Sequence, residues 1–138
     1  MILPEYLSTV FLLPKNEIKQ LKNWPKTFWI ITACNPYSSG QRSEDSQNNA
    51  RLEKDLRASA RWIVPITCTS EDGGHDPEPS FAVSDLNHAQ IQSLAEKYRQ
   101  NAVFLIEDAV LSVISCTGEA PSPAGYFIDK VRAEESDT

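Results

Sequence analysis

A run of mostly apolar residues covers positions 28–34 and ends at Asn35-Pro36. Both alternating sets of side chains in this run are mainly apolar, which is typical of a strand in the middle of a sheet with cover on both faces. Pro36 keeps Asn35 out of the helical region, so we expect the Asn35 amide at a fixed point just past the strand. The pattern predicts a central strand with a polar group at its end.

Two kinds of pattern predict the other elements. Apolar runs predict strands at residues 6–13, 62–68, 78–83, 102–106 and 110–116, and the last two form a hairpin around residues 107–109. Apolar residues at intervals of three and four predict one helix after Ser43 and another after Asn87, with a shorter helix at residues 16–23. Asn87 is a strong N-cap, because Gln90 stands three residues later and completes a capping box.

This order of elements, β-α-β-α-β-β-α-β-β, predicts an α+β fold. We expect a single mixed, largely antiparallel sheet with the two main helices on one face. One domain of residues 1–131 is expected, because 138 residues are typical of one domain. Residues 132–138 are rich in acidic side chains and are expected to form a poorly ordered tail.

The first long helix carries a polar residue on its apolar face. Leu52, Leu56 and Ala60 mark the buried stripe, and counting back by three and four places Asn49 and Asp45 on it. A polar side chain that faces a core needs a hydrogen-bond partner. The nearest candidate is the loop that begins at Asn35.

The charge balance limits the classes of partner. The chain has 13 Lys and Arg against 19 Asp and Glu, a net charge of −6. An acidic chain is a poor match for nucleic acid or for an anionic membrane surface, so both are unlikely partners. No apolar run approaches the ~20 residues of a membrane helix, and we expect neither a membrane span nor a signal peptide.

The number and spacing of the cysteines indicate the cellular compartment of the protein. Cys34, Cys68 and Cys116 form an odd set without C-x-x-C spacing, which favours free thiols in a cytoplasmic protein over disulfides. Each cysteine stands alone in the sequence rather than in a pair, and this pattern does not support a metal site that joins the cysteines with His75 or His88. We therefore expect no metal and no cofactor.

Several short motifs together resemble a known family. They are T-A-C-N-P at residues 32–36, N-A-R-L at 49–52, E-P-S-F-A-V at 78–83, L-A at 94–95 and Q-N-A-V-F at 100–104. In this order they resemble the bacterial family catalogued as domain of unknown function 3293, over roughly residues 6–116. This chain has Cys34 where the family usually has an aromatic residue, and Asp45 where it often has asparagine. The resemblance implies no activity, because the family is named for lacking one.

The candidate site consists of polar residues near the ends of the expected elements: Asn35, Asn49, Glu78, Ser80 and Gln100. We interpret them as a polar pocket for a small-molecule ligand, in which amides donate and accept hydrogen bonds and Glu78 is the ionisable group. On this interpretation the chain is a small binding or regulatory domain. The alternative is that these side chains only satisfy backbone groups of loops and helix ends.

Two further functions stay open. In an enzyme that acts on a small molecule or a nucleotide, Glu78 would be the general acid or base, with Ser80 or His75 as its helper. The chain has no nucleophile elbow, P-loop, zinc-protease motif or dinucleotide fingerprint, which lowers this possibility. The third class is an acidic module that neutralises a basic protein partner, suggested by the net charge and the acidic residues 71–76. The sequence leaves the oligomeric state open.

Overall fold

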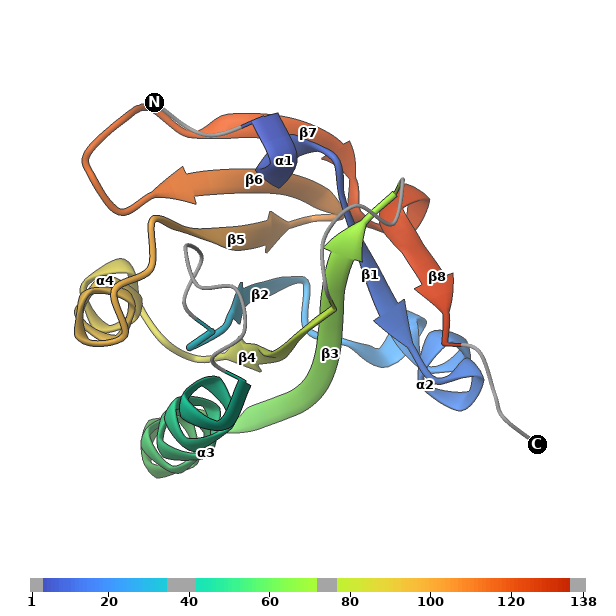
Figure 1. The fold of residues 1–138 in the computed structure, drawn as a ribbon. Helices are drawn as coiled ribbons and strands as arrows, with labels where there is room; N and C mark the ends of the chain where they lie inside the picture. The colour runs from blue at the N-terminus through green and yellow to red at the C-terminus, as the bar shows by residue number, and fades with distance from the viewer. Residues whose placement is uncertain (1–3, 35–41, 72–76, 135–138) are drawn as a thin grey trace.

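The strand β2 (Thr27–Ile31) lies inside an eight-stranded sheet, with β5 on one side and β4 on the other (Figure 1). The computed structural model describes residues 4–34, 42–71 and 77–134. The strand order is β7-β6-β5-β2-β4-β3-β1-β8, and every pairing is antiparallel except that of β1 with β8. The predicted α+β class, the mixed and largely antiparallel sheet and the central place of residues 28–31 are confirmed.

The other strands are β1 (Thr9–Leu13), β3 (Trp62–Ser70), β4 (Glu78–Ser84), β5 (Ala102–Glu107), β6 (Val110–Ser115), β7 (Ser122–Tyr126) and β8 (Val131–Ala133). The helices are α1 (Pro4–Leu7), α2 (Lys15–Lys19), α3 (Arg42–Ser59) and α4 (His88–Lys97), with short 3-10 turns η1 (Leu21–Asn23) and η2 (Phe127–Lys130).

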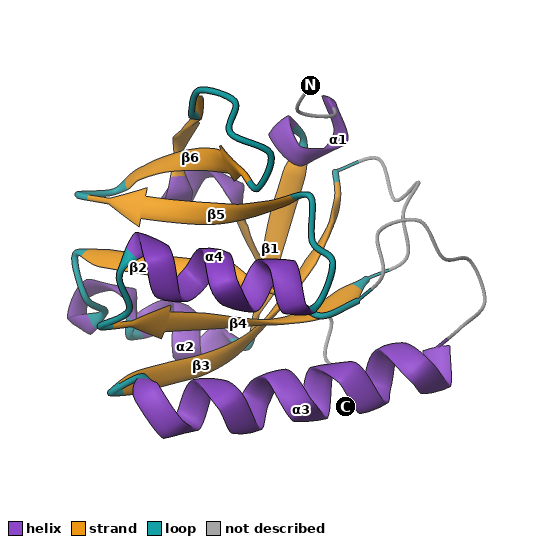
Figure 2. Cartoon of the chain, turned by 90° about the vertical axis from the view of Figure 1, so that its left-hand side faces the viewer, coloured by secondary structure: helices purple, strands orange, loops and turns teal. Residues whose placement is uncertain are grey.

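The two long helices, α3 and α4, pack on the same face of the sheet, as predicted (Figure 2). Leu52 and Leu56 of α3 and Ile91 and Ala95 of α4 are buried there against one cluster of strand residues that includes Trp29. The apolar stripes of both helices are thus packed against the sheet. None of the described helices is long and apolar enough to cross a membrane.

The opposite face of the sheet curls around a second apolar core. Three strands separate β1 from β5 in the sheet, yet the rings of Phe11 and Phe104 lie 5.1 Å apart between centroids. Such a contact requires the sheet to bend like part of a barrel (Figure 1). The core inside the curl therefore has two ends. One is near the end of β2 and the start of β4, and the other is near the start of β2 and the end of β5.

Three parts of the prediction differ from the structure. Residues 6–7 belong to α1 rather than to the first strand, because the chain turns sharply before β1 begins at Thr9. The central strand ends at Ile31 rather than at residue 34, since the N–H groups of Ala33 and Cys34 donate to the side chains of Asn49 and Thr32 instead of to the backbone of a neighbouring strand. β7 and β8 were not predicted. The ordered chain continues past the expected boundary at residue 131, because β8 pairs with β1 and the Glu134 N–H donates to the Leu13 carbonyl.

Candidate functional site

The Asn49 side chain holds the segment that follows β2. Its Oδ1 accepts a hydrogen bond from the Ala33 N–H at 2.8 Å, and its Nδ2 donates to the Pro79 carbonyl at 3.0 Å and to Cys34 Sγ at 3.1 Å. Asn49 is buried two turns into α3, as its place on the apolar stripe predicts. Its partners are Ala33, Cys34 and Pro79, whereas the loop that was expected to bind it, which begins at Asn35, lies outside the described residues. One amide thus ties α3, the end of β2 and the start of β4 together.

Gln100 reaches the same segment from the other side. It follows α4, and its buried Nε2 donates to the Cys34 carbonyl at 2.8 Å and to the Tyr98 carbonyl at 3.1 Å. Arg99, just before it, has a φ of 57°, a left-handed conformation that lets the chain turn from α4 into β5. Cys34 is therefore held between two buried amides, with its carbonyl bound by Gln100 and its thiol by Asn49.

Glu78 and Ser80 lie at the start of β4, on the face that lines the inside of the curl. Glu78 pairs with Cys68 across the β3–β4 ladder and Ser80 pairs with Ile66. The Thr32 hydroxyl donates to the Pro79 carbonyl at 2.7 Å, which fixes the end of β2 beside the two residues. The Ser80 hydroxyl donates to the main-chain carbonyl of Glu78 at 3.0 Å.

These side chains surround a small cleft of about 60 Å³ at one end of the inner core. Its polar lining consists of Thr9, Thr32, Cys68, Glu78, Ser80 and Gln100, and its apolar floor includes Ile30 and Phe104. We call this the Glu78 cleft. Of the described residues that line it, Glu78 is the only charged one.

The thiols near the cleft are kept protonated. The pKa of Cys68 is raised to about 12, chiefly by burial and to a smaller extent by the negative charge of Glu78, although the Ser80 hydroxyl lowers it. Burial also raises the pKa of Cys34, with a smaller raising effect from Glu78, although the bonds from Thr32 and Asn49 lower it. Neutral thiols are weak nucleophiles, so neither cysteine is prepared for covalent catalysis at neutral pH.

The structure brings four of the five predicted residues together. Glu78, Ser80 and Gln100 line the cleft, and Asn49 lies behind it and supports its wall. Asn35 and His75 lie outside the described residues. For Asn49 and Gln100, the alternative interpretation also holds, since their amides bond to backbone groups. Within the described ranges, every buried side-chain polar atom has a partner.

Sequence reasoning missed Thr32 and Cys68 as members of the cleft. Thr32 was placed inside the central strand, and Cys68 was treated as a small apolar residue. The register of the β3–β4 pair would have placed Cys68 opposite Glu78. That register follows from long-range pairing and not from the local sequence.

The described side chains do not form a metal site, because they contain no group of three or more His, Cys, Asp and Glu residues that could hold an ion. The cleft offers hydrogen-bond acceptors at Glu78, small hydroxyls at Thr32 and Ser80, and a negative potential. Its chemistry suits the binding of a donor group better than acid–base work.

Comparison with known proteins identifies a family but no activity. Residues 31–103, which contain the four described candidate residues, match the family described as "Protein of unknown function (DUF3293)". No curated protein and no solved structure matches the chain.

Proposed function

We propose that this chain, which belongs to the family of unknown function DUF3293, is a small ligand-binding domain that holds the amine or amide end of a polar molecule in the Glu78 cleft. The observation that carries this proposal is the composition of the cleft. Among the described residues, its lining contains one carboxylate, the hydroxyl side chains of Tyr6, Thr9, Thr32 and Ser80, and no Lys or Arg. The three unpaired cysteines support a cytoplasmic location.

Electrostatics favours a donor or a cation as the ligand group. Glu78 raises the pKa of two thiols, Cys34 and Cys68, so its negative charge acts across the cleft. An ammonium group would gain a charge-assisted hydrogen bond, and an amide N–H a weaker one. A carboxylate would be repelled. The volume of about 60 Å³ admits the end of such a molecule, and the remainder would extend out of the cleft.

Binding is favoured over catalysis by the contacts of Ser80. Its hydroxyl donates to the Glu78 main-chain carbonyl, and its other neighbour in the cleft is the neutral Cys68 thiol. A general base would need to lie within hydrogen-bond reach of a hydroxyl that it activates. Neutralisation of a basic protein partner remains a proposal that rests on the net charge of −6 and on the acidic residues 71–76 of the sequence.

The proposal can be tested with three probes of nearly equal size: ethylammonium, acetamide and acetate. A ligand of three or four heavy atoms gains at most ~1.5 kcal/mol per atom, about 4.5–6 kcal/mol in all, so its Kd is no tighter than roughly 0.05–0.5 mM. Two-dimensional ¹H–¹⁵N NMR follows such binding residue by residue. We expect ethylammonium to shift the amide signals of Thr32, Cys68 and Ser80 and the side-chain amide of Gln100, with acetamide weaker and acetate without effect.

The matched variants are Glu78→Gln and Glu107→Gln. Glu107 is exposed at the far end of β5, so its loss controls for the change in net charge. Glu78→Gln should weaken ethylammonium binding roughly tenfold, the loss of one charged hydrogen bond. Its stability should hold or rise, as is usual for a residue kept for binding. Unchanged binding together with a loss of ~1–3 kcal/mol of stability in Glu78→Gln would show that Glu78 only braces the loop and would overturn the proposal.

A further inference from the structure

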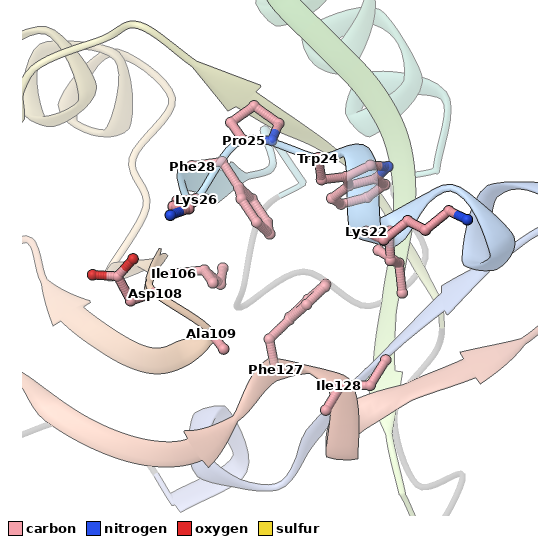
Figure 3. A pocket seen from close by; sticks show the side chains of 11 residues that line it. Lys22, Trp24, Pro25, Lys26, Phe28, Ile106, Asp108, Ala109, Phe127 and Ile128 are labelled. Carbon is pink, nitrogen blue, oxygen red and sulfur yellow. The ribbon is translucent and has the colours of Figure 1, made fainter.

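The other end of the curled core opens into a larger cavity of about 460 Å³ (Figure 3). It lies near the start of β2 and the turn between β5 and β6, far along the strands from the Glu78 cleft. Its apolar lining consists of Leu21, Trp24, Pro25, Phe28, Ile106, Ala109, Phe127 and Ile128. We call it the aromatic cavity. Its volume falls in the range of ~300–1,000 Å³ that is typical of small-molecule sites.

Three rings from separate segments form its walls. The Phe28 ring meets the Trp24 ring at 5.3 Å and 80°, and the Phe127 ring at 5.3 Å and 83°, so each pair packs edge to face. Trp24 Nε1 donates to the Glu17 carboxylate at 3.0 Å. Because that bond satisfies the indole nitrogen outside the cavity lining, Trp24 offers the cavity an apolar surface. A flat ring suits such walls, since aromatic rings prefer edge-to-face and offset contacts.

The rim of the cavity is basic although the chain is acidic. Four lysines, Lys15, Lys19, Lys22 and Lys26, stand within residues 15–26, and the one acid of that segment is Glu17. Lys22 and Lys26 line the cavity, are exposed and form no ion pair with the described residues. Their field therefore remains available to an incoming anion.

Asp108 is the one acidic residue among the described residues that line the cavity. It lies on the same side of the cavity as Lys26, while Lys22 lies beside Trp24 (Figure 3). The Asp108 N–H donates to the Lys26 carbonyl at 2.9 Å, which fixes the β5–β6 turn against the segment that follows η1. The lining carries two cations against one anion, so its net charge favours an anionic ligand.

From this arrangement we infer that the aromatic cavity binds a small aromatic anion, an arene carboxylate or sulfonate. Its ring system lies among Trp24, Phe28 and Phe127, and its anionic group points to the rim at Lys22 and Lys26. This site is independent of the Glu78 cleft and has the opposite preference for charge. The apolar walls supply most of the affinity, and the lysines select the sign of the charge.

The test uses three ligands with the same ring: 2-naphthoate, 2-naphthylmethylammonium and 2-naphthalenemethanol. Binding is measured by NMR titration, with the Trp24 side-chain N–H and the backbone amides of Ala109 and Phe127 as reporters. A ligand of this size with apolar contacts is expected to bind with a Kd on the order of 0.1–1 mM. Naphthoate should bind tightest, the neutral alcohol next and the ammonium compound weakest.

Two variants change the rim charge in opposite directions. Asp108→Asn removes the negative charge of the carboxylate and should therefore tighten naphthoate binding roughly threefold. The turn should be kept in this variant, because asparagine also tolerates the left-handed backbone at this position, where φ is 48°. Lys26→Glu should weaken naphthoate roughly tenfold and tighten the ammonium compound. Lys54→Glu, an exposed change on α3, is the matched control and should leave all three affinities unchanged.

Each contrary outcome has a defined meaning. Equal affinities for the three ligands would show that the cavity does not select for the charge of the ligand, and this result would overturn the inference. Shifts confined to the exposed Tyr126 and Val110, outside the cavity lining, would do the same. If Lys26→Glu and Lys54→Glu weaken naphthoate alike, the effect belongs to the overall charge, and the site at Lys26 is refuted. Failure here leaves the Glu78 proposal intact, because its reporters lie at the other end of the core.

Discussion

Replacing Asn49 by alanine should destabilise the fold more than any other single polar change on α3. The side chain makes three hydrogen bonds, to the Ala33 N–H, the Pro79 carbonyl and Cys34 Sγ. The Pro79 carbonyl keeps a second partner, the Thr32 hydroxyl. The Ala33 N–H loses the side chain that satisfies it, and Ala33 is 1% exposed. Most of the lost stability is therefore expected to come from one buried backbone donor, the Ala33 N–H, that is left without a partner.

The magnitude follows from these contacts. An unsatisfied buried donor costs ~1–3 kcal/mol, and each further lost hydrogen bond about 1 kcal/mol. The expected loss is ~3–4 kcal/mol, a large part of the ~5–15 kcal/mol that stabilises a typical domain. With a urea m-value of about 2 kcal/mol/M, the midpoint of unfolding falls by roughly 1.5–2 M.

The assay is urea unfolding followed by tryptophan fluorescence and circular dichroism. Asn48→Ala is the control, because Asn48 is the preceding residue of the same helix and its contact is an exposed one with Arg51 at 3.4 Å. It should cost less than about 0.5 kcal/mol. Asn49→Asp keeps the acceptor for Ala33 but loses the amide donor to Pro79, so it should be less harmful at acid pH, where its carboxyl group can donate. Equal losses in Asn48→Ala and Asn49→Ala, or a loss below ~1 kcal/mol in the latter, would refute the reasoning.

Two other changes test the packing of the helices and of the hairpin. The bonds from Lys97 and Tyr98 lower the pKa of Asp55 below its usual 3.8, so its stabilising effect is present above that value and is lost as pH falls through the folded-state pKa. Asp55→Asn should therefore lower the melting temperature at neutral pH, and its melting temperature should approach that of the wild type as pH falls below the folded-state pKa. A deficit that does not change with pH would contradict this linkage. Ala109 has a φ of 76° in the two-residue turn of the β5–β6 hairpin, a conformation that glycine adopts more easily than alanine. Ala109→Gly should therefore stabilise the fold by ~0.5–1 kcal/mol. The control Ala58→Gly, in the exposed part of α3, should destabilise the fold by about 1 kcal/mol, because glycine is unfavourable inside a helix. Urea unfolding measures both, and a loss of stability in Ala109→Gly would show that the turn is unstrained.

The elements that the sequence predicted well are those specified by neighbouring residues. The capping box of α4 is present in both directions, with the Gln90 N–H donating to Asn87 Oδ1 at 2.9 Å and the Asn87 N–H to Gln90 Oε1 at 2.8 Å. The β5–β6 hairpin joins two strands that are adjacent in the chain. Such features need no knowledge of the rest of the molecule, and the two long helices therefore lie where their stripes predicted.

The strands at the two edges of the sheet could not be read in the same way. β7 contains Pro123 and Gly125, residues that are unfavourable in strands, and its pairing with β6 has a register shift between Val110 and Ser112. β8 has three residues and pairs with β1, more than a hundred residues earlier in the chain. Both depend on partners rather than on their own pattern. The curl of the sheet depends on the same long-range contacts.

The candidate site was predictable in part. The position of Asn49 on an apolar stripe predicted that its side chain would have a hydrogen-bond partner in the core, and the structure shows bonds to Cys34 and Pro79. The aromatic cavity was missed, because Phe127 lies far from Trp24 and Phe28 in the sequence and meets them only in the folded chain. The lysines of residues 15–26 stand at helical spacing, a pattern that is more typical of a solvated helix face than of a ligand site. A tryptophan between two lysines and next to a proline was the local signal available.

The central claim is that the two ends of one core bind groups of opposite charge. A single NMR sample titrated with ethylammonium and then with 2-naphthoate tests it most directly. The account predicts that ethylammonium shifts Thr32, Ser80 and Gln100, that naphthoate shifts Trp24 and Phe127, and that neither ligand displaces the other. Competition between the two, or shifts from both ligands at the same residues, would contradict it.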